Sequence, residues 1–211
     1  TLTGSGIICN SVPPPPESTE IPLVVKSGTF YGAINGPIQL GKIGADTFTL
    51  SGTNTYTGGT AINYGTLRIW HQSPGTDSIP NDGVVYLSDQ GKLEVVNSNE
   101  TIGQLLAWNA WGRLTVNGGS LTVDSAQNSQ IEGPLSGQGS FVKDGTGELY
   151  IQHSIDFSGT IFVNEGTLKL WGWGSLGTAK FVLNGGTLLT DSGLVKTISN
   201  SVTFGGDVTL G

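Results

Sequence analysis

The chain has 211 residues, enough for one sizeable domain, and 34 of them are glycine, well above the usual share of about 7%. Its 16 acidic and nine basic residues leave a net charge of −7, the wrong sign for a protein that binds nucleic-acid phosphates. No apolar run approaches the ~18–20 residues that a membrane-spanning helix needs. We therefore expect a soluble protein with no nucleic-acid partner and no membrane-spanning segment.

The composition favours strands over helices. Thr, Val, Ile and Leu are frequent, and no stretch of about 12 residues without Gly or Pro places apolar residues at helical spacing. The single cysteine, Cys9, cannot form an intramolecular disulfide, so packing alone must stabilise the fold. We predict an all-β protein.

The N-terminal part, residues 1–31, is expected to form one or more coils that carry a proline-rich loop at residues 11–22. The four consecutive prolines at 13–16 remove donors from any strand ladder and favour polyproline II. We interpret this stretch as a surface loop or as a linker to an upstream domain. A ligand for a proline-recognising domain is a third alternative.

An internal repeat dominates the rest of the chain. Residues 32–70 align with residues 133–171 at a constant shift of 101 positions and without a gap. The identical positions in the first copy are Gly32, Gly36, Lys42, Gly44, Gly58, Asn63, Gly65, Thr66, Leu67 and Trp70, which return as Gly133, Gly137, Lys143, Gly145, Gly159, Asn164, Gly166, Thr167, Leu168 and Trp171. The repeat divides the chain into a first unit, 32–132, and a second unit, 133–211, of one continuous domain.

A shorter period is marked by leucines that stand two positions after a glycine: Leu67, Leu93, Leu114 or Leu121, Leu149, Leu168 and Leu188. Their spacing of roughly 20–28 residues is typical of one solenoid turn, and it predicts a β-solenoid of roughly nine or ten coils. Alternation predicts that Leu67 and Ile69 point inward and that Arg68 and Trp70 point outward. A meandering sandwich is the alternative, but it does not explain an ungapped repeat.

The stretch from Asp46 to Leu67, with Lys42-Ile43-Gly44 before it, resembles the passenger-associated transport repeat, also called the autotransporter-associated β-strand repeat. Residues 137–168 are similar to a more divergent member. The resemblance implies a right-handed parallel β-helix in a cell-surface or secreted protein of the type V secretion class. It also implies an extracellular location on a Gram-negative bacterium.

No residue pattern indicates a metal site, a cofactor or a catalytic centre. His71 and His153 have no partner at metal-ligand spacing, and we interpret both as solvated turn residues. The carboxylates are scattered, and those of Asp82 and Asp144 stand beside glycines, as turn residues do. We therefore expect no enzyme activity, and a polysaccharide-degrading β-helix enzyme is the least favoured alternative.

The tryptophans are the candidate ligand-binding residues. Trp70 and Trp171 share a repeat position, each two residues after a cation, Arg68 or Lys169, and we expect both stations on one side of the rod, about 19–24 Å apart. Trp108, Trp111 and Trp173 add to this candidate set. Exposed Trp beside a cation suits a host or matrix glycan or a surface protein, whereas the alternative is that the indoles only cover the flank.

These observations favour a structural rod of a surface or secreted autotransporter-like protein, whose repeats aid export and folding. The first alternative is an adhesin module that uses the outward tryptophans. A second alternative is end-to-end self-association into a filament, because both ends, 1–6 and 202–211, read as strands with unpaired backbone groups.

Overall fold

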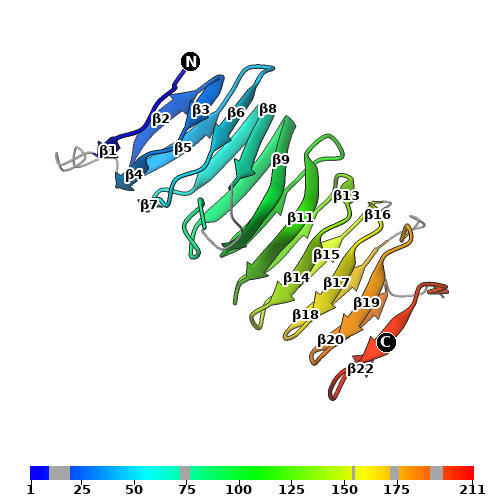
Figure 1. Cartoon of the computed structure of the whole chain (residues 1–211). Coiled ribbons are helices and arrows are strands. Elements are labelled where there is room, and N and C mark those ends of the chain that lie inside the picture. Colours follow the sequence, from blue (N-terminus) through cyan, green and yellow to red (C-terminus); the bar gives the residue numbers. More distant parts are fainter. Residues whose placement is uncertain (10–19, 72–76, 154, 172–175, 191–196) are drawn as a thin grey trace.

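The computed structural model describes residues 1–9, 20–71, 77–153, 155–171, 176–190 and 197–211, and this part of the chain forms an elongated stack of short strands (Figure 1). In these ranges there is no helix, and therefore none long and apolar enough to cross a membrane. The strands stack in parallel as a β-solenoid of about nine turns, as predicted from the leucine spacing. An antiparallel sandwich is therefore wrong for this part of the chain.

Each coil of the solenoid contributes strands to three faces. Face 1 contains β2 (Ile21–Val25), β5 (Ile38–Lys42), the starts of β8 (Thr60–Trp70) and β9 (Val84–Ile102), β10 (Gln104–Ala107), β12 (Ser129–Ile131), β15 (Glu148–Ile151), β18 (Thr167–Leu170), β20 (Thr187–Thr190) and β22 (Thr209–Leu210). Face 2 contains β3 (Gly28–Phe30), β6 (Thr47–Leu50), the end of β8, the middle of β9, the start of β11 (Arg113–Asp124), β13 (Leu135–Gly137) and β16 (Ile155–Phe157). Face 3 contains β1 (Ile7–Cys9), β4 (Ala33–Gly36), β7 (Thr55–Tyr56), the ends of β9 and β11, β14 (Ser140–Asp144), β17 (Thr160–Val163), β19 (Lys180–Leu183) and β21 (Val202–Phe204).

The core consists of the aliphatic and aromatic side chains that stack inside the three-faced solenoid. Leu67 and Ile69 are fully buried, as the alternation predicts, and Leu67 pairs in register with Leu93, which pairs with Leu114. Burial of one such side chain contributes about 1.5–3 kcal/mol. Because each coil stacks the same kind of side chain on the one before, the interior is continuous from coil to coil.

The two repeat copies fold into the same local unit. In the first copy β5 and β6 turn a corner, and β8 repeats that corner one coil later with Lys42 opposite Ile62 and Phe48 opposite Leu67. In the second copy β14 and β15 stack on β17 and β18 with the matching register, Lys143 opposite Val163 and Leu149 opposite Leu168. The repeat therefore encodes two stacked corners, not a whole number of coils.

A buried lysine closes each of these corners. The Nζ of Lys42 donates to the carbonyls of Ile43, Gly44 and Tyr64, at 3.0, 2.7 and 2.9 Å. The Nζ of Lys143 donates to the carbonyls of Asp144, Gly145 and Glu165, at 2.7, 2.6 and 3.2 Å. Burial lowers the pKa of both lysines, although nearby carboxylates oppose this. The repeated lysine is thus a structural clamp that ties one coil to the next.

The glycines of the repeat are required at the same corners. Gly65 has a φ of +70°, and a Cβ there would lie 2.2 Å from the carbonyl oxygen of Gly44. Gly166 has a φ of +67°, and its Cβ would lie 2.4 Å from the carbonyl oxygen of Gly145. Only glycine combines this left-handed backbone with so close an approach of the neighbouring coil.

The two copies lie on different faces, which corrects the expectation that they share one side of the rod. The face 1 ladder runs from Ile62 through Leu87, Ala107 and Ile131 to Ile151 after four coils, and reaches Leu170 after five. The residue 101 positions after Ile62 is Val163, on face 3. The sequence shift falls between four and five coils because the corner loops differ in length, so the second copy is rotated by one face.

The N-terminal coil needs a second correction. Ile21 and Pro22, which we expected in the proline-rich loop, lie in β2 and pair with Ile38 and Gln39. The rest of that loop, residues 10–19, lies outside the described residues. Pro22 is tolerated because β2 is the first strand of face 1 in the described chain, and an edge strand has no second neighbour that needs its missing N–H. The unit boundary at 132/133 stays a prediction.

Candidate functional site

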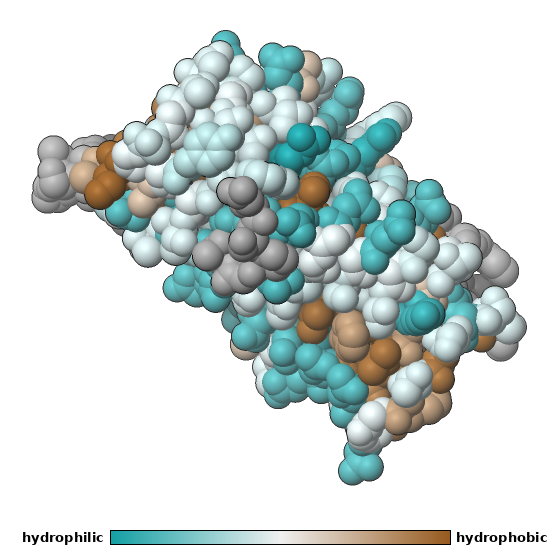
Figure 2. Space-filling view, viewed as in Figure 1, coloured by the Kyte–Doolittle hydropathy of each residue, from teal (hydrophilic) through white to brown (hydrophobic). Residues whose placement is uncertain are grey.

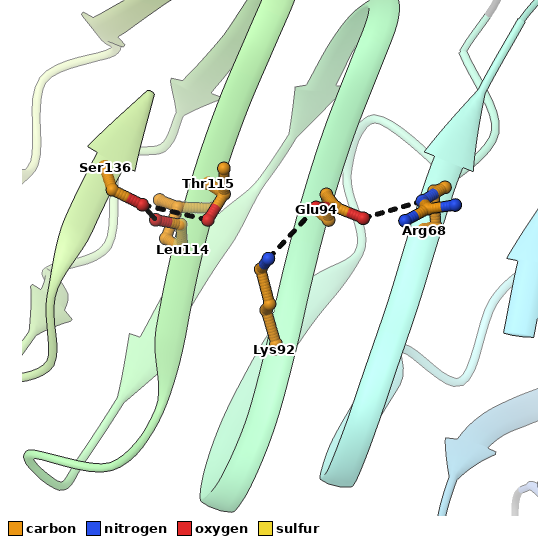
Figure 3. Close-up of polar contacts among 6 residues, drawn as sticks. All are labelled: Arg68, Lys92, Glu94, Leu114, Thr115 and Ser136. Carbon is orange, nitrogen blue, oxygen red and sulfur yellow. Dashed lines mark hydrogen bonds and ion pairs between the residues drawn. The ribbon is translucent and has the colours of Figure 1, made fainter. Parts of the chain in front are cut away.

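The outward surface of face 2 carries a row of charged side chains (Figure 3). The carboxylate of Glu94 lies between two cations, with Oε2 2.6 Å from Nε of Arg68 and Oε1 3.0 Å from Nζ of Lys92. Burial tends to raise the pKa of Glu94, but the hydrogen bonds and charges of Lys92 and Arg68 outweigh it and hold the pKa below its usual value. Glu94 is therefore ionised at neutral pH.

Arg113 lies beside this network without joining it. It pairs with Lys92 across the β9–β11 ladder, and it makes no ion pair with any described residue. Two cations directly opposite each other on neighbouring strands destabilise a sheet. Further along face 2 the polar row continues without charge, where the hydroxyls of Thr115 and Ser136 lie 3.0 Å apart (Figure 3).

A pocket of about 320 Å³ opens where face 1 turns into face 2, and we call it the corner pocket. Its lining residues come from three successive coils: Gly65, Thr66, Gln90, Lys92, Trp111 and Arg113. The pocket thus combines an indole, two cations, an amide and a hydroxyl. Its volume lies at the lower end of the range for small-molecule sites.

Trp111 stands in the short loop between β10 and β11, and a tight turn holds that loop. The side-chain oxygen of Asn109 accepts hydrogen bonds from the N–H groups of Trp111 and Gly112, at 3.0 and 2.9 Å. The Trp111 side chain is nevertheless 64% exposed. Asn109 thus fixes the backbone from which a large, mostly uncovered aromatic side chain projects.

A second aromatic group lies on face 1, three coils further along. The rings of Tyr150 and Trp171 are 5.6 Å apart at 50°, and the Nζ of Lys169 lies 4.5 Å above the Tyr150 ring and also contacts its hydroxyl. Lys169 is thereby held on the outward surface by a cation–π contact. Sequence reasoning named Lys169 and Trp171 but missed Tyr150, whose outward position in β15 was the available signal.

The structure regroups the predicted tryptophans. Trp171 follows β18 and Trp108 follows β10, and these strands belong to the same ladder of face 1, so the two indoles leave the same corner three coils apart, about 14 Å by strand spacing. Trp70 ends β8 on face 2, in register with Val96, and does not join them. Trp173 lies outside the described residues.

The visible surface of the solenoid is not uniform in polarity. Figure 2 shows mostly hydrophilic and neutral side chains over the middle of the rod and a gathering of hydrophobic ones over the C-terminal coils. On face 3 of those coils, Val142, Phe162 and Val182 stack outward in register and are only half-buried.

A buried polar group inside the prism overturns one expectation. His71 is 6% exposed, and its Nε2 lies 2.8 Å from the hydroxyl of Ser78, so it is not a solvated turn residue. The carboxyl group of Glu100 accepts the N–H groups of Ser78 and Ile79, in a coil whose described residues form no strand on face 3. Burial raises the pKa of Glu100 to about 8 despite these hydrogen bonds. His153, in contrast, is exposed as expected.

The described residues contain no cluster of three or more His, Cys, Asp or Glu side chains that suits a metal ion. Two carboxylates, those of Glu20 and Asp82, do line a common pocket of about 170 Å³ on face 1. Asp82 is exposed and stands in the turn 81–83, whereas a general acid is usually held in a buried, apolar place. We therefore interpret Asp82 as a turn residue and not as a catalytic acid.

The two repeat copies seen in the structure coincide with two matches to a known repeat family. The passenger-associated transport repeat family matches residues 40–69 and 141–170, which are the strands and corners of the two structural copies. The chain is therefore a β-solenoid built on two passenger-associated transport repeats.

The chain is also similar in sequence to a curated protein. The chain is 30% identical over 177 residues to the protein named Adhesin BmaC autotransporter of Brucella suis biovar 1 (strain 1330). The match covers 76% of this chain but only 5% of that protein. No solved structure matches the chain significantly.

Proposed function

We propose that the chain is a non-enzymatic structural segment of the passenger of a bacterial surface or secreted autotransporter, and that its outward flank takes part in adhesin-type binding. The observation that carries the structural role is the shared register of the two repeat copies. The name of the Brucella relative supports both the export route and the adhesin-type activity. The proposal includes an extracellular position on a Gram-negative bacterium, which the resemblance to the repeat family implies.

The repeat copies suit folding that follows export. Each copy pairs its first two strands with strands about 20 residues later, so a coil finds its partner soon after it emerges. Because each coil contacts mainly its neighbours, folding propagates along the chain from a formed coil. Folding outside the membrane then biases transport in the outward direction.

This export role is tested by opening the core of each copy in the full-length parent protein. Leu67→Asn and Leu168→Asn each place a polar group in the buried ladder, and we expect slower appearance of the passenger at the cell surface, measured as protease-accessible passenger over time. The control variants Thr49→Asn, one coil before Leu67, and Thr167→Asn, next to Leu168, change outward residues and should leave the rate unchanged. Unaltered export in both leucine variants would contradict the proposal.

The binding role is favoured by the corner pocket and by the exposed indoles of Trp108, Trp111 and Trp171. Tryptophan is enriched in protein interfaces and among the residues that dominate binding energy, so exposed indoles along one edge favour a binding surface. The filament hypothesis stays a prediction, because no contact between copies bears on it. An enzyme would need two carboxylates set apart as acid and base, and Asp82 lacks the burial that this role requires.

A further inference from the structure

We propose that the corner pocket binds an acidic sugar: a saccharide ring that carries a carboxylate or a sulfate. This inference rests on the adhesin-type part of the proposed function, and it names the ligand class of that surface. The pocket consists of Gly65, Thr66, Gln90, Lys92, Trp111 and Arg113, at the turn from face 1 to face 2.

The charge of the pocket points to an anion. Lys92 and Arg113 stand opposite each other, and among the described residues only the carboxylate of Glu94 forms ion pairs in this group, with Lys92 and with Arg68. Arg113 therefore keeps an uncompensated charge within the described part of the chain. In a protein with a net charge of −7, a local positive site is a selective place for an anionic group, and the arginine fork suits a carboxylate or a sulfate.

The indole of Trp111 supplies the second part of the recognition. It is largely exposed, and Asn109 holds its loop, so the ring is available before any ligand arrives. A flat, exposed indole is a stacking surface for the apolar face of a sugar ring, and with only two side-chain torsions it loses little conformational entropy on binding. An indole beside an unpaired arginine thus matches a ring that bears an acidic substituent.

Polar groups complete the match with a saccharide. The amide of Gln90 and the hydroxyl of Thr66 line the same pocket and provide donors and acceptors for ring hydroxyls. An acidic peptide would use the cations but would leave the indole and these groups without specific partners. For this reason we assign the pocket to an acidic sugar and treat an acidic peptide as an outcome of the test.

The test measures binding to the chain by isothermal titration calorimetry with four probes: trigalacturonate, a sulfated trisaccharide, neutral maltotriose and hexaglutamate. We expect binding of one or both acidic saccharides, at least tenfold weaker binding of maltotriose and hexaglutamate, and loss of affinity as salt increases. Trp111→Ala and Arg113→Gln should each weaken binding at least tenfold. The matched controls Tyr31→Ala and Lys180→Gln, an exposed aromatic and an exposed cation elsewhere, should bind as the unaltered chain does.

Carboxylated and sulfated probes distinguish the two sources of the negative charge, and binding of either supports the proposal. Equal binding of hexaglutamate or maltotriose, unchanged affinity of Arg113→Gln, or no binding of any probe would overturn it. Adhesion of cells that display the parent protein is measured in parallel. If cells with Trp111→Ala still adhere, the corner pocket is not the binding site, although the adhesin-type function stands. If cells with the unaltered parent do not adhere, the adhesin-type function itself is wrong.

Discussion

Replacement of Lys42 and Lys143 by methionine tests whether each of these lysines is a structural clamp between two coils. Methionine has nearly the length of lysine but donates no hydrogen bond. Lys42→Met removes the donor shared by the carbonyls of Ile43, Gly44 and Tyr64, and Lys143→Met does the same at the second corner. The two variants therefore make the same change in two places.

The expected loss follows from two opposing effects. Buried carbonyls left without a donor cost about 1–3 kcal/mol each, and loss of a hydrogen bond from a charged group adds to that cost. Removal of the buried ammonium, whose pKa is lowered by burial, also removes its desolvation cost, and this offsets part of the lost stability. We expect each variant to lower the free energy of unfolding by about 2–4 kcal/mol.

Urea unfolding, followed by circular dichroism, measures this loss. The two variants should lose similar amounts because the two corners share their register, and Lys180→Met, at an exposed lysine of β19, should change the midpoint little. A loss below about 0.5 kcal/mol at both corners would refute the clamp, since surface substitutions already vary by that much. A large loss at only one corner would refute the equivalence of the copies.

Two further predictions concern the buried Glu100 and the corner glycine Gly65. Glu100 has a folded-state pKa of about 8 against an ordinary value of 4.5, so the folded chain keeps a proton that the unfolded chain releases, and stability should fall as pH rises from about 4.5 to about 8. Urea unfolding at pH 5 and pH 8 should show this decrease, by up to about 1.4 kcal/mol per pH unit, and Glu100→Gln should flatten it; parallel pH profiles for the two proteins would disprove the assignment. Gly65→Ala should cost more than about 1 kcal/mol because it combines a left-handed backbone with a Cβ 2.2 Å from the Gly44 oxygen, whereas Gly41→Ala, whose Cβ has 3.7 Å of space, should be nearly neutral. Thermal unfolding of the two alanine variants compares them directly, and equal melting temperatures would count against the close-approach argument.

The amino-acid sequence by itself determined the β-solenoid, because its signals are local. Alternation places Leu67 and Ile69 on the same side of their strand, and glycines such as Gly65 and Gly166 allow the left-handed backbone of the corners. The identity of Lys42 and Lys143 was visible in the repeat. Their burial was not, because a lysine is ordinarily exposed and only the coil stacked upon it supplies the third carbonyl.

The tertiary structure alone decided which residues share a side. The face on which a strand falls depends on the summed lengths of every corner between it and its neighbours, and a sequence alignment of two copies does not measure that sum. Trp171 therefore shares a corner with Trp108, not with Trp70. The same reason applies to the corner pocket, whose lining residues come from three successive coils: Thr66 from the first, Gln90 and Lys92 from the second, and Trp111 and Arg113 from the third.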